Sequence, residues 1–172
     1  MNFENHAPGL PWVPLHGYQL RLAGIYFDAV RVGGEYGRNA AVQLGRLTGG
    51  EPGPIIFERE LDGGGERAVT YFLVPPQSTG RRRWPAGVER LSGTVGCGDR
   101  RQFVGVPALS GPTWPLRWHC PPTPDGRLVH GPLLHAVLCA LAQGAGEGGR
   151  DEPPPFAWRQ GEGRGYADGG GS

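Results

Sequence analysis

Glycine and proline divide this chain into short segments more strongly than any other feature of the sequence. They account for 32 and 18 of the 172 residues, and they cluster between runs of apolar residues. Both residue types interrupt regular structure, because glycine gains conformational freedom and proline lacks a backbone donor. The 38% hydrophobic content is below the globular average. The shortage is concentrated in the C-terminal segment, so the length fits one domain with an appendage.

The apolar runs predict an α+β domain over residues 19–143, with the element order β-α-β-β-(β)-β-α. The βαβ start and the hairpin that follows predict a small mixed sheet of about five strands, with both helices on one face. Residues 102–107 and 114–119 are expected to pair, the second as an edge strand because Pro115 cannot donate. Strands are expected at residues 25–32, at the end of an apolar run that begins at 19, and at 55–60, 68–74, 102–107 and 114–119. A turn or short strand is expected at 88–91. Helices are expected from Glu35 to the stop at Gly49–Gly50 and at 131–142.

The two ends of the chain are expected to lie outside this domain. Residues 1–18 are rich in proline, which predicts an extended arm that packs one aromatic side chain on the domain. Residues 144–172 are rich in glycine and proline and poor in apolar residues. They predict a disordered tail, because such a segment cannot bury enough surface to offset its ordering entropy.

The charge balance limits the classes of partner. All 17 basic residues are arginine, and with 16 acidic residues the net charge is only +1, so any polyanion contact must come from a local patch. The chain has no apolar run of membrane-spanning length and no signal-peptide pattern at its N-terminus. We therefore expect a cytoplasmic protein without a membrane partner. The three cysteines, Cys97, Cys120 and Cys139, are expected to be free thiols.

Arginine occurs together with tryptophan at 81–84 and at 114–118, and a further pair of arginines stands at 100–101. Guanidinium groups bind phosphates, and aromatic faces stack on bases. If these patches converge in space, they predict a nucleic-acid-binding surface; the alternative is a solvated loop with tryptophans in the core. The residues predicted to bind nucleic acid are Arg81, Arg82, Arg83, Trp84, Arg117 and Trp118.

Asp28 is the most informative acidic residue, because it lies inside a predicted strand. A buried carboxylate is costly unless it is paired or bound to something. The structural alternatives are a salt bridge to Arg31 or Arg21, or a position at a solvated strand end. Asp28 and Glu89 are the catalytic candidates. The histidines lack the H-x-x-x-H spacing of a zinc site, and no metal or cofactor is predicted.

Six short motifs, IYFDAVRV, GPIIFE, AVTYFLVPP, GVERLSG, FVGVPAL and RWHCPP, lie within residues 22–122. Together with the short helix after the first motif, they resemble the later strands of the bifunctional DNA primase/polymerase domain of actinobacterial mobile elements. The resemblance implies descent from a fold that holds metal ions and nucleotide with an Asp-x-Asp strand end, a Ser-x-His strand and a later Asp.

The matched positions imply an incomplete active site. Asp28 stands at the first acid, but Val30 stands at the second. Val69 or Thr70 stands where the family has histidine, and Glu89 is the nearest match to the third acid. One acid cannot position two metal ions, so the resemblance implies a degenerate active site.

We therefore expect a non-catalytic primase/polymerase-like domain that binds DNA, RNA or nucleotide in a replication, mobile-element or regulatory role. The alternative is a protein-interaction module that uses the Pro-rich arm and tail, because polyproline segments are already extended. The second alternative is a metal-dependent nucleotidyltransferase or hydrolase. It alone requires a divalent metal, held by Asp28, Glu89 and a third acid or histidine.

Overall fold

A five-stranded sheet forms the centre of the fold, with the strand order β7-β4-β6-β5-β9. The computed structural model describes residues 6–62, 65–80, 82–93 and 101–147. Every pairing in the sheet is antiparallel. The α+β class and the sheet of about five strands agree with the prediction. The strands are β4 (Asp28–Gly33), β5 (Ile55–Asp62), β6 (Gly65–Val74), β7 (Val88–Leu91) and β9 (Leu116–Cys120).

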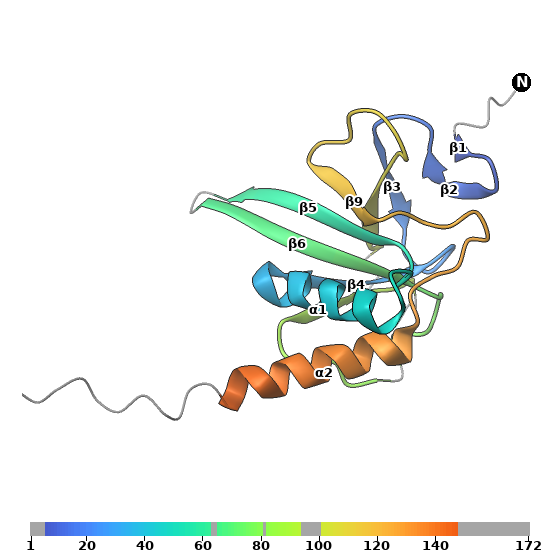
Figure 1. Ribbon diagram of the computed structural model, residues 1–172. Coiled ribbons are helices and arrows are strands. Elements are labelled where there is room, and N and C mark those ends of the chain that lie inside the picture. The colour runs from blue at the N-terminus through green and yellow to red at the C-terminus, as the bar shows by residue number, and fades with distance from the viewer. Residues whose placement is uncertain (1–5, 63–64, 81, 94–100, 148–172) are drawn as a thin grey trace, which may run out of the picture.

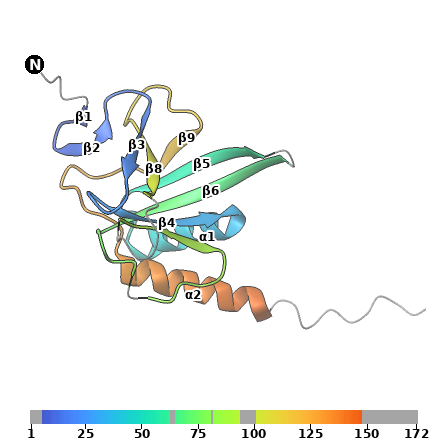
Figure 2. The ribbon, with the colours of Figure 1, turned by 180° about the vertical axis from the view of Figure 1, so that it is seen from behind.

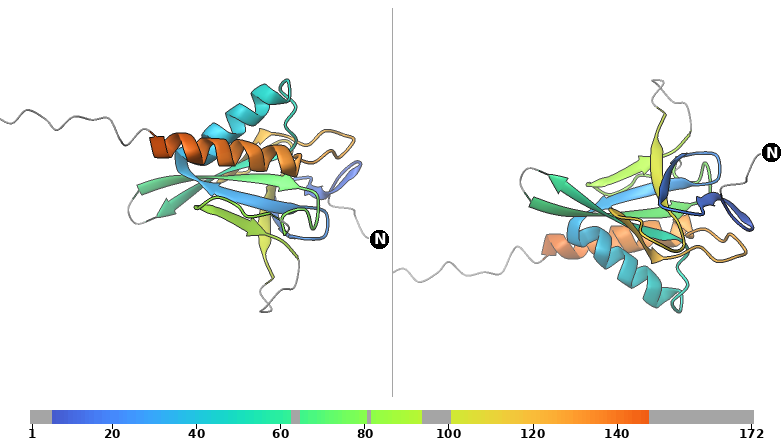
Figure 3. Two further views of the ribbon diagram at one scale, coloured as in Figure 1. Left: turned by 90° about the horizontal axis from the view of Figure 1, so that it is seen from below. Right: turned by 90° about the horizontal axis from the view of Figure 1, so that it is seen from above.

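Two helices, α1 (Gly34–Leu47) and α2 (Gly131–Glu147), cover one face of this sheet (Figures 1 and 3). Alternate residues of β4 and β6, such as Val30 and Phe72, face the helices and are fully buried against them. α2 continues beyond the predicted end at residue 142, and residues 148–172 lie outside the described residues. Neither helix in the described part is long and apolar enough to span a bilayer.

A second layer of strands covers part of the opposite face (Figure 2). It contains the ribbon formed by β3 (Tyr18–Leu22) and β8 (Phe103–Pro107), and the short pair β1 (His6–Ala7) and β2 (Leu10–Pro14). A second apolar core fills the space between this layer and the sheet. Its largest buried side chains include Trp12, Phe27, Ile56 and Leu73.

The predicted run over residues 19–32 is divided into two strands that belong to different sheets. Gly24 has a φ of +91°, and a Cβ atom there would lie 2.3 Å from the Cα of Gly93. The Gly24 amide donates to the Phe27 carbonyl at 2.7 Å and closes the turn. Only glycine fits this close approach of two backbones, so the chain leaves β3 here and enters the central sheet as β4.

The predicted pairing of residues 102–107 with 114–119 is wrong. β8 pairs with β3, whereas β9 pairs with β5 at the edge of the central sheet. The edge position of β9 is as predicted. The short link between β8 and β9 therefore connects two layers instead of closing a hairpin.

The N-terminal arm is extended, as predicted, but it is part of the core. Leu10, Val13 and Pro14 are buried, and Trp12 is only 5% exposed. The Trp12 ring contacts Phe27 edge-on, with the centroids 5.4 Å apart. Residues 10–14 therefore contribute to the fold and do not form a free docking segment.

Gly37 allows α1 to approach the sheet closely. A Cβ atom at this position would lie 2.6 Å from the Val32 carbonyl oxygen and 2.8 Å from Thr70 Oγ1. The Thr70 hydroxyl is buried and has no hydrogen-bond partner among the described residues. The helix thus rests directly on β4 and β6 at the first turn.

We expect Gly37→Ala to lower the free energy of unfolding by about 1–3 kcal/mol, because the added methyl group overpacks this contact. Urea denaturation measures the change. Gly45→Ala in the same helix is the matched control, because a Cβ atom there meets nothing within 4 Å. This control should raise stability by up to about 1 kcal/mol. Equal gains for both variants would contradict the close packing at Gly37.

Candidate nucleic-acid interface

The residues predicted to bind nucleic acid do not converge on one surface. The ladder pairs place Arg117 of β9 in one row with Phe57, Thr70, Val32 and Val88. Neighbouring strands are about 4.8 Å apart, so Arg117 and Val88 lie at opposite edges of the sheet, about 19 Å apart. The loop with residues 81–84 immediately precedes Val88. The patches at 81–84 and 114–118 are therefore separate, and Arg100 of the third patch lies outside the described residues.

Arg117 and Trp118 face opposite sides of the sheet. Arg117 is exposed and lies over the Phe57 ring, 5.3 Å from its centroid. Trp118 points into the second core, where its Nε1 donates to the Ala108 carbonyl at 3.2 Å. Its ring also contacts Trp12 edge-on. Trp118 is a core residue, and Arg117 remains as an isolated cation at the β9 edge.

Residues 79–87 form the second candidate surface, which we call the basic loop. Arg82 and Arg83 are exposed, Trp84 is half-buried, and Arg81 lies outside the described residues. The Trp84 Nε1 donates to the Thr79 carbonyl at 3.1 Å. Arg90 of β7 donates to the same carbonyl at 3.3 Å. Thr79 therefore joins the start of the loop to its tryptophan and to the neighbouring strand.

Helix α2 holds the middle of the basic loop. The Arg83 carbonyl lies 2.8 Å from His135 Nε2, and because a carbonyl can only accept, the imidazole donates. The rings of His135 and Trp84 meet edge-on at 5.2 Å. These contacts hold the backbone at Arg83 and the ring of Trp84, next to the exposed side chains of Arg82 and Arg83.

The cations of this region are not neutralised by the described residues. Arg82, Arg83 and Arg90 form no ion pair with any part of the chain that the structure describes, whereas Arg31 and Arg127 do. Unpaired arginines gathered on one loop and its adjoining strand create a local positive field, although the whole chain has a net charge of +1.

Asp28 holds the start of the basic loop through Thr79. It is fully buried, and its Oδ2 accepts a hydrogen bond from the Thr79 hydroxyl at 3.2 Å. Neither predicted salt-bridge partner reaches it, because Arg21 donates to the Trp12 carbonyl and Arg31 pairs with glutamates. Burial raises the pKa of Asp28, and hydrogen bonds, led by that of Thr79, oppose this effect.

Glu89 belongs to a row of polar side chains that crosses the sheet on the face opposite the helices. Arg31 pairs with Glu89 at 3.0 Å and with Glu60 at 2.7 Å. It also donates to the Tyr71 hydroxyl, which in turn donates to Glu58 at 2.6 Å. Burial and the Glu58 carboxylate raise the pKa of Tyr71, so the hydroxyl stays a donor. This row supports the sheet.

The geometry does not assemble the acids that metal catalysis requires. Residues 28 and 31 differ by an odd number along β4, so Asp28 and the Glu89 opposite Arg31 face different sides of the sheet. Val30 and Val69, which stand at positions of metal ligands in the resemblance, are buried apolar side chains. Among the described residues, no three acids, histidines or cysteines are grouped to hold a metal ion.

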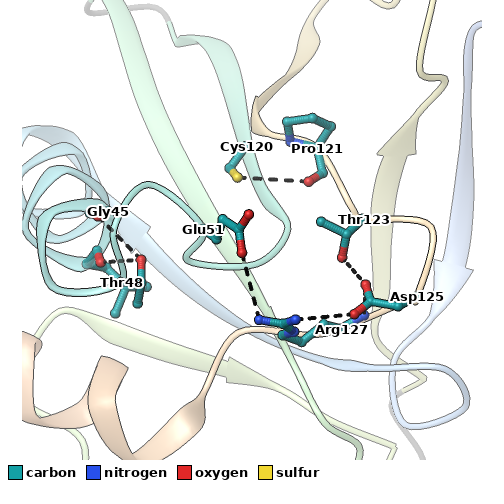
Figure 4. A network of polar contacts seen from close by, with 9 residues as sticks. Gly45, Thr48, Glu51, Cys120, Pro121, Thr123, Asp125 and Arg127 are labelled. Carbon is teal, nitrogen blue, oxygen red and sulfur yellow. Dashed lines mark hydrogen bonds and ion pairs between the residues drawn. The ribbon is translucent and has the colours of Figure 1, made fainter.

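Two cavities lie away from the basic loop. A cleft of about 580 Å³ opens at the start of α1, but its charged groups are already paired, Arg31 with two glutamates and Arg38 with Glu35. A smaller cavity of about 250 Å³ lies beside Cys120, and Pro121, Pro122 and Pro124 are among the residues that line it. Figure 4 shows Cys120 and Pro121 near the polar contacts of Arg127. At the rim of this cavity, Arg127 pairs with Asp125 and lies 3.9 Å from Glu51. Neither cavity presents an unpaired cation.

Comparison with protein-family models, characterised proteins and solved structures found no match.

Two parts of the interface were not predicted from the sequence. Arg90 was missed, although its position two residues after Val88 puts both side chains on the helix-facing side of β7. His135 was not predicted either. Its spacing of four residues from Cys139, on the same face of the predicted helix, was the available signal.

Asp28→Asn should raise the free energy of unfolding at pH 7, because it removes a buried charge and keeps an acceptor for Thr79. A raised folded-state pKa means that protonation stabilises the wild type as the pH falls, so the advantage of the variant should shrink toward pH 4. Denaturant unfolding at both pH values measures this. Asp28→Ala is the control and should be about 1–3 kcal/mol less stable than Asp28→Asn at both pH values, because Thr79 loses its partner. A pH-independent difference for Asp28→Asn would contradict the burial of a charged carboxylate.

Proposed function

We propose that this domain is a non-catalytic binder of nucleic acid or nucleotide and that the basic loop is its contact surface. The observation that carries the proposal is the group of arginines without an ion pair among the described residues, Arg82, Arg83 and Arg90, around a loop held at Thr79 and at Arg83. A fixed loop with free guanidinium groups suits phosphate, because little conformational entropy is lost on binding.

The residues of this surface favour contacts with the nucleic-acid backbone over recognition of the bases. Arginines at a loop bind phosphate oxygens, which carry no sequence information. Trp84 is half-buried and already donates to Thr79, so only part of its ring is open for stacking. We therefore propose sequence-independent binding, with a dissociation constant of about 10⁻⁴ to 10⁻⁶ M at physiological salt.

The biological role proposed here follows from the resemblance to primase/polymerase domains. Buried valines at two ligand positions support a domain that lost catalysis and kept contact with nucleic acid. Replication, mobile-element maintenance or its regulation is the corresponding setting. Fold analogy alone gives no activity, so the binding surface carries the proposal.

The test is fluorescence anisotropy of labelled single- and double-stranded oligonucleotides, and of a labelled nucleotide, with the full chain at two salt concentrations. Affinity for the oligonucleotides should fall steeply with salt, because binding releases counterions. The double variant Arg82→Gln/Arg83→Gln should bind more weakly and reduce the slope of log affinity against log salt by about 1.5.

The matched control is Arg38→Gln/Arg46→Gln, which removes two exposed arginines from α1. It changes the net charge equally but leaves the basic loop intact. Equal losses in the two double variants, or no binding at low salt, would overturn the proposed interface.

A second candidate function, protein binding, is favoured by the outer face of the β3–β8 ribbon. Tyr18, Leu20 and Phe103 are 49%, 64% and 50% exposed. The register places all three on the same face of the ribbon. Grouped exposed apolar side chains are typical of a surface that meets another protein.

A photo-crosslinking amino acid placed at Leu20 tests this candidate in cells. Leu47 on α1 is the matched control, because it is equally exposed at 62% but lies away from the ribbon. We expect a discrete protein adduct at position 20 and none at position 47. Similar labelling at both positions, or none at either, would contradict a docking role for the ribbon.

A further inference from the structure

Cys139 and His135 form a thiol–imidazole pair on α2. They are four residues apart, so their side chains share one face of the helix. The Cys139 Sγ lies 3.9 Å from Nδ1 and 3.7 Å from Nε2 of the imidazole ring. The same ring holds the basic loop through the Arg83 carbonyl, 2.8 Å from Nε2.

The contact with Arg83 determines which nitrogen of His135 is free. A carbonyl oxygen only accepts, so Nε2 carries the hydrogen. In the neutral ring, Nδ1 is then an acceptor with an open lone pair, and it lies within reach of the Cys139 thiol. This arrangement lets His135 take the thiol proton while its other nitrogen keeps the loop in place.

The pair lies near a cavity of about 460 Å³ between the two helices and the basic loop. Tyr36, Ala86 and Leu141 contribute to its walls. The Tyr36 hydroxyl donates to the carbonyl of Leu138, the residue before Cys139, at 2.7 Å, and it interacts electrostatically with the Cys139 thiol. Cys139 is half-buried, so the residue is partly accessible to a small reagent.

We propose that Cys139 is a peroxide-sensitive thiol whose oxidation weakens the hold of α2 on the basic loop. The regulatory part of this inference rests on the proposed function of that loop, whereas the chemical part does not. The reactant class is a small hydroperoxide, with hydrogen peroxide as the simplest member.

The reaction is a two-electron oxidation of sulfur. His135 accepts the thiol proton, and the thiolate attacks one peroxide oxygen as the O–O bond breaks. The departing hydroxide takes a proton and leaves as water. The products are Cys139 sulfenic acid and water, and the peroxide is the species reduced.

The product alters the contact that fixes the loop. The sulfenic acid adds an oxygen next to His135, and this oxygen competes with the Arg83 carbonyl for the imidazole hydrogen. Loss of that hydrogen bond releases the backbone beneath Arg82 and Arg83. One such hydrogen bond changes an equilibrium constant a few-fold, so the affinity for nucleic acid should fall by about fivefold.

The first experiment treats the full chain with hydrogen peroxide and traps sulfenic acid with dimedone, followed by mass spectrometry of each cysteine peptide. Cys139 should label about tenfold faster than Cys120. Cys120 is an internal control, because burial and the nearby Glu51 raise the pKa of its thiol. Equal labelling of the two cysteines, or none at Cys139, would overturn the proposal.

The variant His135→Gln separates the two roles of the histidine. Glutamine still donates to the Arg83 carbonyl but cannot take the thiol proton. Labelling of Cys139 should fall about tenfold in this variant, while thermal unfolding stays close to the wild type. Unchanged labelling in a folded His135→Gln protein would show that the imidazole is not the base.

The second experiment measures oligonucleotide affinity before and after peroxide treatment, beside Cys139→Ser. Oxidation should weaken binding by the wild type and leave Cys139→Ser unchanged. If the reduced protein does not bind, the proposed function fails, and dimedone labelling still decides the chemistry. Oxidation of Cys139 without any change in affinity would overturn the regulatory part.

Discussion

The buried carboxylate of Asp28 connects the core of this protein to its candidate interface. It accepts from the Thr79 hydroxyl, and the carbonyl of Thr79 in turn accepts from Trp84 and Arg90. One residue in a strand that is buried on both faces therefore determines where the loop begins. The contact of His135 with the Arg83 carbonyl holds the middle of the same loop. The exposed side chains of Arg82 and Arg83 lie close to these two contacts.

The apolar runs predicted most elements of the fold, because each strand or helix is short and bounded by glycine or proline. The layer to which an element belongs could not be predicted. The turn at Gly24 depends on the backbone of Gly93, which is distant in the sequence. The pairing of β8 with β3 instead of β9 likewise depends on the N-terminal arm, which supplies Trp12 to the core beneath the ribbon.

The candidate site shows the same division between local and long-range information. The arginines at 82 and 83 could be identified as binding candidates from the sequence alone. Arg117 and Trp118 were grouped because they are neighbours in sequence, yet neighbours on a strand point to opposite faces. The links from Asp28 to Thr79 and from Arg83 to His135 join residues that are far apart in the chain. No local pattern contains them.

The position of Trp12 has a consequence for how this protein forms on the ribosome. Its ring packs against Trp118 and lies in a core that also contains Val104, Val106 and Leu116. Trp12 thus acquires its neighbours on β8 and β9 only after more than a hundred further residues have been synthesised. Contacts between such distant residues form slowly. The second core therefore cannot close until β9 has emerged, and the apolar face of β4 and β6 beneath it stays open until then.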